Sequence, residues 1–364
     1  MSGLPGSTSA ASDPDAMGEY EKSLAAEIVK LKEKLKASRL EVANTDFFKM
    51  TEKLKEIGRV KIKDRKHLRG HLAKVTDLRW GQDSQLAVSA AQDGNLIVWD
   101  TFGPNKLFMI NLQNQWVFAC EFFPKMDYVV SGGLDNLITL HSLKGREGPT
   151  AEQVKQISGH NGYISCIRSI DYENLLTGSG DKTSILWDVE TSKPKITFSG
   201  HLNDVTCIAL PKDSTKNKFV TVSTDKSCRV WDVRTGKCTQ YFDGHEQDVN
   251  GVDFFPESSY GFATSSDDGS CRLWDLRADQ AIAVYIDEFV QSGSTTVALS
   301  KSGRLLLAGY DDFNCHIWDL LREERVGIMS GHDGRVSKVA ISENGIGVAS
   351  ASWDKTCTIW SSKC

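Results

Sequence analysis

The sequence predicts an all-β fold, a seven-bladed β-propeller, preceded by an N-terminal coiled-coil α-helix. Trp-Asp pairs recur along the chain at a nearly constant spacing, and short strand-like runs such as KVTDLRW, QLAVSA and NLIVWD fill the intervals. Before the first repeat stands a run of helix-forming residues without glycine or proline, YEKSLAAEIVKLKEKLKASRLEVA. The repeats predict the propeller, and the run before them predicts the helix.

The tryptophans that mark the repeats are 42 to 44 residues apart, except for one gap of 88 residues. The double gap predicts a further unit whose tryptophan is missing, and its place falls at His141 in LITLHSL. Seven units result, and their short strands separated by turn residues predict seven four-stranded antiparallel sheets. The marker tryptophans are Trp99, Trp187, Trp231, Trp274, Trp318 and Trp360.

Three further kinds of residue recur at nearly constant distances from the marker tryptophans. An aspartate stands six residues before each marker position, at Asp93, Asp135, Asp181, Asp225, Asp268, Asp312 and Asp354. A serine or threonine stands four residues before that aspartate, at Ser89, Ser131, Thr177, Thr221, Thr264 and Ser350, with Ala308 in unit six. A Gly-His pair precedes five units, at His71, His160, His201, His245 and His332. Because buried polar groups need partners, we expect a hydrogen-bond relay of tryptophan, hydroxyl, histidine and aspartate in each complete unit.

The last unit ends close to Trp360 and so lacks a fourth strand. An unassigned strand-like run at residues 58–68, GRVKIKDRKHL, precedes the first Gly-His pair. We expect this run to complete the last blade, which joins the two ends of the ring and removes an exposed sheet edge.

Composition and motifs exclude several classes of protein. The net charge of −5 argues against a nucleic-acid binder, and no apolar run is long enough for a membrane span or a signal peptide. Seven of the nine cysteines recur at fixed places in the repeat, which predicts buried, reduced thiols and a reducing compartment. No nucleotide-binding, hydrolase or metal motif is present, and the acidic pairs at 267–268 and 311–312 each contain a turn aspartate. We therefore expect no enzyme activity, no cofactor and no metal site.

The predicted domains are a disordered tail at 1–17, a coiled-coil helix at 18–43, a short helix and linker at 44–58, and the propeller at 59–364. Apolar residues repeat along this helix at heptad spacing, which predicts pairing with a partner helix. The alternative is that the apolar stripe packs on the ring itself. The residues of this stripe, the heptad seam, are Leu24, Ile28, Leu31, Leu35 and Val42.

Units of this length with Gly-His and Trp-Asp are the signature of WD repeats. A heptad helix followed by seven such repeats resembles the beta subunits of heterotrimeric G proteins. The similarity is closest in LRGHLAKV at 68–75, CRLWDLRADQ at 271–280, SGRLLLAGYDDFNC at 302–315 and SGHDGRVS at 330–337.

The resemblance implies an obligate gamma subunit on the N-terminal helix and a GDP-bound alpha subunit on one face of the ring. Receptors and effectors are reached through the complex. It implies a cytoplasmic protein at the inner face of the plasma membrane, held there only through lipidated partners. A general WD-repeat scaffold of the activated-kinase-receptor type is the alternative; that family lacks the heptad helix.

Site residues are implied where the motifs match. The alpha-subunit and effector contacts are Leu72, Lys74, Ile97, Lys106, Trp116, Phe118, Leu134, Tyr163, Asp204, Asp248, Asn250, Asp267 and Trp353. The sequence departs from the family on the same face, where Thr76 replaces the usual tyrosine and Phe118 and Thr206 replace methionine.

Overall fold

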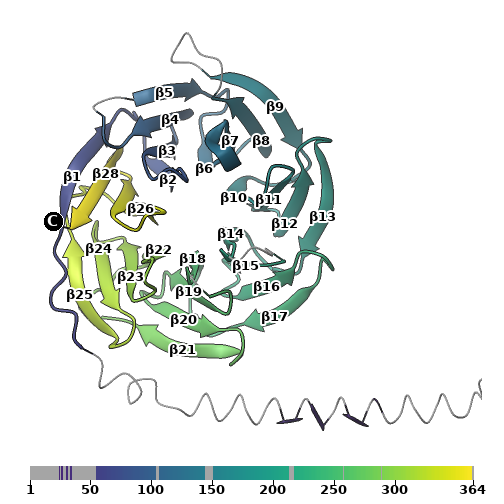
Figure 1. Ribbon diagram of the computed structural model, residues 1–364. Helices are drawn as coiled ribbons and strands as arrows, with labels where there is room; N and C mark the ends of the chain where they lie inside the picture. Colours follow the sequence, from purple (N-terminus) through teal and green to yellow (C-terminus); the bar gives the residue numbers. More distant parts are fainter. Residues whose placement is uncertain are drawn as a thin grey trace, which may run out of the picture. The chain divides into compact units, whose positions relative to one another are not determined.

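The chain forms two compact units, Met1–Asp46 and Phe47–Cys364. The computed structural model describes residues 55–362, apart from 104–105, 144–150, 213–216, 257 and 288, together with seven residues between 24 and 34. In the second unit the described strands form seven four-stranded antiparallel sheets, arranged in a ring (Figure 1). This arrangement confirms the seven-bladed β-propeller that the repeats predict.

Blades 1 to 6 each run in chain order from an inner strand to an outer strand, and blade 7 takes its outer strand from the start of the propeller. Blades 1 and 2 contain β2 (Val75–Trp80), β3 (Leu86–Ala91), β4 (Asn95–Asp100), β5 (Lys106–Asn111), β6 (Val117–Phe122), β7 (Tyr128–Gly133), β8 (Leu137–Ser142) and β9 (Glu152–Ser158). Blades 3 and 4 contain β10 (Ile164–Ser169), β11 (Asn174–Ser179), β12 (Thr183–Asp188), β13 (Lys193–Ser199), β14 (Val205–Ala209), β15 (Lys218–Ser223), β16 (Cys228–Asp232) and β17 (Cys238–Phe242). Blades 5 and 6 contain β18 (Val249–Phe254), β19 (Gly261–Ser266), β20 (Cys271–Asp275), β21 (Gln280–Tyr285), β22 (Ser294–Leu299), β23 (Leu305–Tyr310), β24 (Cys315–Asp319) and β25 (Glu324–Met329). Blade 7 contains β26 (Val336–Ile341), β27 (Gly347–Ser352) and β28 (Thr356–Ser362), and a single-turn η1 (Pro124–Met126) lies in blade 2.

The core lies between successive blades. Second strands such as β3, LAVSAA, are buried along almost their whole length because each sheet is covered on both faces. One core cluster joins Leu78 and Trp99 of blade 1 to Ala349 and Ile359 of blade 7. Each blade therefore depends on its neighbours for burial, as expected of a repeat fold.

The ring is closed by β1 (Ile62–Arg69), which pairs antiparallel with β28 and forms the outer strand of blade 7. The register runs from Ile62 opposite Ser362 to Arg69 opposite Thr356. Residues 55–61 have no regular secondary structure, so the strand begins later than the run at 58–68 that suggested it. Both ends of the propeller thus share one sheet.

A β-bulge occurs at the second residue of all seven inner strands. The bulge turns this side chain toward the next blade, as bulges re-aim side chains elsewhere. In six blades the bulged residue donates a hydrogen bond to a main-chain carbonyl of the next inner strand: Thr76 to Val117, Ser165 to Val205, Thr206 to Val249, Asn250 to Ser294, Thr295 to Val336 and Ser337 to Val75. We call this set the inner girdle. In blade 2 the bulged residue is Phe118, whose ring instead meets Tyr163 edge-on at 5.5 Å.

In the first unit, the seven described residues between Leu24 and Lys34 are all helical. The two seam residues among them, Leu24 and Leu31, are 40% and 57% exposed. The other predicted seam residues, the tail at 1–17 and most of 44–58 lie outside the described residues. Within the described part of the chain, no helix is long and apolar enough to span a membrane.

Candidate partner-binding face

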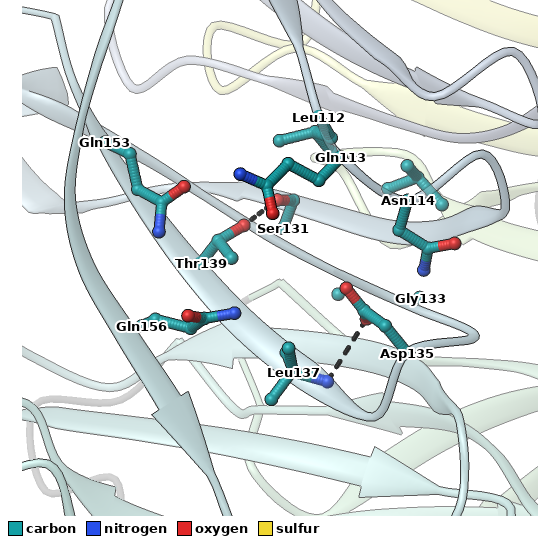
Figure 2. A pocket seen from close by; sticks show the side chains of 12 residues that line it. Leu112, Gln113, Asn114, Ser131, Gly133, Asp135, Leu137, Thr139, Gln153 and Gln156 are labelled. Atoms are coloured by element: carbon teal, nitrogen blue, oxygen red, sulfur yellow. Dashed lines mark hydrogen bonds between the residues drawn. The ribbon is translucent and has the colours of Figure 1, made fainter.

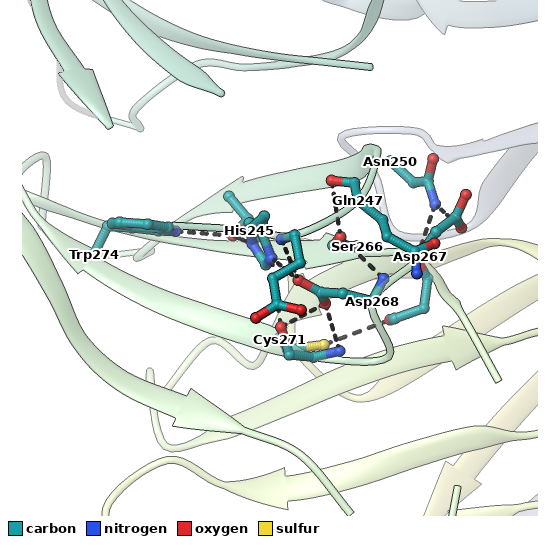
Figure 3. A network of polar contacts seen from close by, with 12 residues as sticks. His245, Gln247, Asn250, Ser266, Asp267, Asp268, Cys271 and Trp274 are labelled. Carbon is teal, nitrogen blue, oxygen red and sulfur yellow. Dashed lines mark hydrogen bonds and ion pairs between the residues drawn. The ribbon is translucent and has the colours of Figure 1, made fainter. Parts of the chain in front are cut away.

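The predicted relay is present in the five blades that begin with a Gly-His pair. In blade 5, His245 Nδ1 lies 2.9 Å from Asp268 Oδ2 and His245 Nε2 lies 2.7 Å from Thr264 Oγ1 (Figure 3). Trp274 Nε1 donates to the same hydroxyl at 2.8 Å. The same bonds join the equivalent residues of blades 1, 3, 4 and 7. All groups are satisfied when tryptophan donates to the hydroxyl, the hydroxyl to Nε2, and Nδ1–H to the carboxylate.

The relay holds its aspartates in the ionised form. Burial by itself would raise the pKa of Asp93, but hydrogen bonds from His71 and from the main-chain N–H groups of Leu72 and Asn95 lower it to about 2. The relay aspartates of blades 3, 4, 5 and 7 have pKa values shifted in the same direction by the same opposing causes. The relay thus ties the loop before each inner strand to the turn after the second strand.

Blades 2 and 6 do not contain the relay. In blade 6, Asp312 Oδ2 pairs with His316 Nε2 at 2.8 Å, a partner that the repeat pattern did not predict for it. Ala308 gives Trp318 no hydroxyl, so blade 6 lacks the tryptophan–hydroxyl bond, and the relay was expected only in complete units. In blade 2, Ser131 Oγ lies 2.6 Å from Thr139 Oγ1.

One main-chain hydrogen bond recurs in all seven blades, and several of the predicted contact residues take part in it. The residue before each turn aspartate donates its N–H to the carbonyl of the residue before the inner strand. The seven pairs are Gln92–Lys74, Leu134–Trp116, Gly180–Tyr163, Thr224–Asp204, Asp267–Asp248, Asp311–Gly293 and Trp353–Arg335. We call the surface formed by these pairs, with the bulged residues beside them, the rim face.

Side chains of the rim face contact one another from blade to blade. Phe118 packs edge-on against both Trp116, at 6.2 Å, and Tyr163, at 5.5 Å, between ring centroids. Tyr163 donates its hydroxyl hydrogen to Asp204 Oδ2 at 2.8 Å. Burial raises the pKa of Tyr163, and this hydrogen bond raises it further, so the phenol stays protonated. Blades 2 to 4 therefore offer an ordered aromatic surface.

Blades 5 and 6 contribute an acidic sector. Asn250 Nδ2 donates to Asp267 Oδ1 at 2.6 Å, as seen in Figure 3. Burial raises the pKa of Asp248, and the nearby charge of Asp267 adds to this effect. Burial also raises the pKa of Asp311, against the opposing charge of Arg335. Several carboxylates thus share a small area, which favours a partner that brings positive charge.

Blades 7 and 1 contribute a cationic and aromatic sector. Lys74 Nζ lies 3.6 Å from the centroid of the Trp353 ring, and the Arg335 guanidinium lies 5.1 Å from it. Arg335 also pairs with Asp311 Oδ1 at 2.8 Å, which connects this sector to the acidic one. These cation–π contacts hold the indole, 37% exposed, at the surface.

Ten of the thirteen predicted contact residues belong to the rim face, and Leu72, Lys106 and Ile97 do not. Leu72, Trp116 and Leu134 are 75%, 47% and 52% exposed. Lys106, at the start of β5, is exposed, with its Nζ 5.9 Å from the Trp99 ring. Ile97 in contrast is 0% exposed and lies in the core between blades 7 and 1. The expectation that Ile97 meets a partner is wrong for this conformation, because its β4 side chain points into the sheet interface.

The sequence reasoning missed two residues of the rim face and one exposed residue that follows a relay histidine. Arg335 and Asp311 occupy the same positions as Lys74 and Asp267 in their own blades. Leu202 follows its Gly-His pair as Leu72 does, and it is 72% exposed. Repeat position was the signal that could have found all three.

Comparison with known proteins agrees with this architecture. Residues 17–361 match the family of G protein beta WD-40 repeat proteins. The chain is also 46% identical over 338 residues to the guanine nucleotide-binding protein G(I)/G(S)/G(T) subunit beta-1 of Homarus americanus, a match that covers 93% of this chain and 98% of the relative. The chain belongs to the G protein beta family. G protein beta subunits are non-catalytic signalling proteins, and a rim of aromatic and charged side chains suits that role.

Proposed function

We propose that this G protein beta subunit binds a GDP-bound alpha subunit on the rim face and signals to effectors through the same face after release. The observation that carries the proposal is Trp353, an exposed indole held between Lys74 and Arg335. Tryptophan and arginine are the residue types most enriched at energetic centres of protein interfaces. A pre-positioned ring loses little side-chain entropy on binding, so its burial contributes more affinity.

The inner girdle supports a mechanism based on competition for one surface. Six side-chain hydrogen bonds hold neighbouring blades together directly behind the rim face. A ring held in this way presents the same surface whether or not a partner is bound. Alpha subunit and effector then exclude each other by occupying the same residues, and receptors act through the assembled complex.

We also propose that the N-terminal helix pairs permanently with a gamma subunit through a coiled coil. Leu24 and Leu31, seven residues apart, are exposed in helical conformation, as a heptad seam without its partner would be. The domain limits expected from the sequence, 1–17, 18–43, 44–58 and 59–364, belong to this proposal. So does a cytoplasmic location at the inner face of the plasma membrane through lipidated partners.

The rim face is tested by Trp353→Ala in calorimetry of the beta–gamma pair with a GDP-bound alpha subunit. We expect a loss of about 2 kcal/mol, roughly thirtyfold in affinity. Tyr260→Ala is the matched control, because Tyr260 is also exposed and held by two cations, Lys218 at 4.5 Å and Arg277 at 5.3 Å, but lies outside the rim face. Equal affinity of both variants and the unchanged protein would refute the assignment.

The gamma contact is tested by co-purification of a tagged gamma subunit with Leu31→Asp combined with Leu35→Asp. Two carboxylates in the seam cannot be buried against a partner helix, so we expect the pair to be lost. Lys30→Asp combined with Lys34→Asp alters the neighbouring face of the same helix and serves as the control. Retention of gamma by the leucine variant would exclude the seam.

A further inference from the structure

Blade 2 keeps part of the relay without its histidine. Ser131 and Asp135 occupy the hydroxyl and aspartate positions of the repeat. Gln113 stands four residues before the inner strand, where blades 1, 3, 4, 5 and 7 have the relay histidine, and His141 takes the place of the tryptophan. The hydroxyl and the carboxylate of the relay are therefore present, but blade 2 has no histidine whose imidazole would join them.

The remaining polar groups make fewer bonds than their counterparts. In blade 1, Asp93 accepts hydrogen bonds from His71 and from the main-chain N–H groups of Leu72 and Asn95. Among the described residues, the Asp135 carboxylate accepts one hydrogen bond, from the main-chain N–H of Leu137 at 3.2 Å. Asp135 thus retains an accessible carboxylate oxygen.

A cavity of about 320 Å³ occupies this part of blade 2. Figure 2 shows the polar side chains arranged around it, and they supply hydroxyl, amide and carboxylate groups: Gln113, Asn114, Ser131, Asp135, Thr139, Gln153 and Gln156. The volume lies at the lower end of the range of small-molecule sites, roughly 300–1,000 Å³. The cavity adjoins the rim face, because Asn114 Oδ1 accepts the main-chain N–H of Trp116 at 3.2 Å.

The five blades that contain the relay show what chemistry fits between these groups. In them an imidazole bridges carboxylate and hydroxyl, with Nδ1–O distances of 2.7 to 3.2 Å and Nε2–O distances of 2.7 to 2.8 Å. We propose that the blade 2 cavity is a binding site for an imidazole ring supplied from outside the chain, which bridges Asp135 and Ser131 as the relay histidines do. The site follows from the blade itself and does not depend on which partner occupies the rim face.

An imidazole ring has two possible sources, a free small molecule or a histidine side chain of a protein docked beside Trp116. Both present the same nitrogen atoms, and they differ in the main chain attached to the ring. Two probes separate them: 4-methylimidazole, which has the ring alone, and N-acetyl-histidine-N-methylamide, which carries the main chain. The chain must be used without a histidine tag, which would compete for the site.

The experiment is a calorimetric titration of the full beta–gamma pair with each probe. We expect weak, saturable binding of 4-methylimidazole, as suits a ligand of few atoms. Asp135→Asn removes the charge-assisted hydrogen bond and should weaken binding by about tenfold. Asp243→Asn, a change of the same kind at another exposed aspartate, is the control and should leave the affinity unchanged.

Gln113→His provides a second, independent variant. It places an imidazole at the relay position of blade 2, so we expect binding of both probes to be lost and the melting temperature to rise by a few degrees. Binding of both probes to the unchanged protein supports a side-chain ligand, and binding of the bare ring alone supports a free one. Absence of saturable binding, or equal binding to the unchanged, Asp135→Asn and Gln113→His proteins, would overturn the proposal.

Discussion

The relay hydroxyl of blade 5 offers the sharpest test of what stabilises the ring. Thr264 is 0% exposed, and its Oγ1 meets both His245 Nε2 and Trp274 Nε1. Thr264→Val preserves the branched shape of the side chain and removes only its hydrogen bonds. The change leaves two buried nitrogen groups without their partner at 2.7 and 2.8 Å.

The expected cost follows from those two unpaired groups. A buried donor or acceptor that loses its partner costs about 1–3 kcal/mol, so two such groups should lower the free energy of unfolding of Thr264→Val by about 2–6 kcal/mol. Thr296→Val is the matched control, because among the described residues the Thr296 hydroxyl is buried without a hydrogen-bond partner. Loss of that hydroxyl should be neutral or slightly stabilising.

Urea unfolding followed by tryptophan fluorescence measures both changes, since Trp274 lies in the perturbed site. Both variants exchange the same atoms, a hydroxyl for a methyl group. They differ only in whether the native threonine hydroxyl makes hydrogen bonds. Blade 6 agrees with this reasoning, because it lacks the hydroxyl, with Ala308 in its place, and the Gly-His histidine together. If Thr264→Val destabilises the protein no more than Thr296→Val does, the relay is not a stabilising device.

Two further predictions concern the fold. The pKa of Asp93 is lowered to about 2 in the folded protein, below the unfolded value, so its contribution is complete above about pH 4 and disappears as the pH falls through about 2. Urea midpoints measured from pH 5 downward should therefore fall, and Asp93→Asn should make that fall shallower; an unchanged slope would contradict the role of the carboxylate. Removal of Ile62–Arg69 exposes the edge of β28, so we expect aggregation in size-exclusion chromatography, whereas removal of residues 1–17 should leave the ring intact. A monodisperse protein without β1 would show that strand closure is dispensable.

The spacing of the repeats predicts much of the propeller, because the same short sequence pattern forms each blade. Trp231 and Asp225 lie on one hairpin, so their spacing in the sequence is set by the geometry of that hairpin. The count of seven blades and the relay of blades 1, 3, 4, 5 and 7 follow from such local spacing. Blade 6 could not be predicted in this way, because His316 replaces a missing partner from a position that the repeat does not use.

The sequence by itself therefore determined the number of blades, the relay and the family. Tertiary structure alone decided which side chains of the rim face meet, because Phe118 and Tyr163, or Arg335 and Asp311, belong to different blades. It also decided that Ile97 is buried, since burial depends on the neighbouring sheet. Bulges direct Thr76 and Thr206 into the inner girdle, and their position depends on how each inner strand pairs with its neighbour.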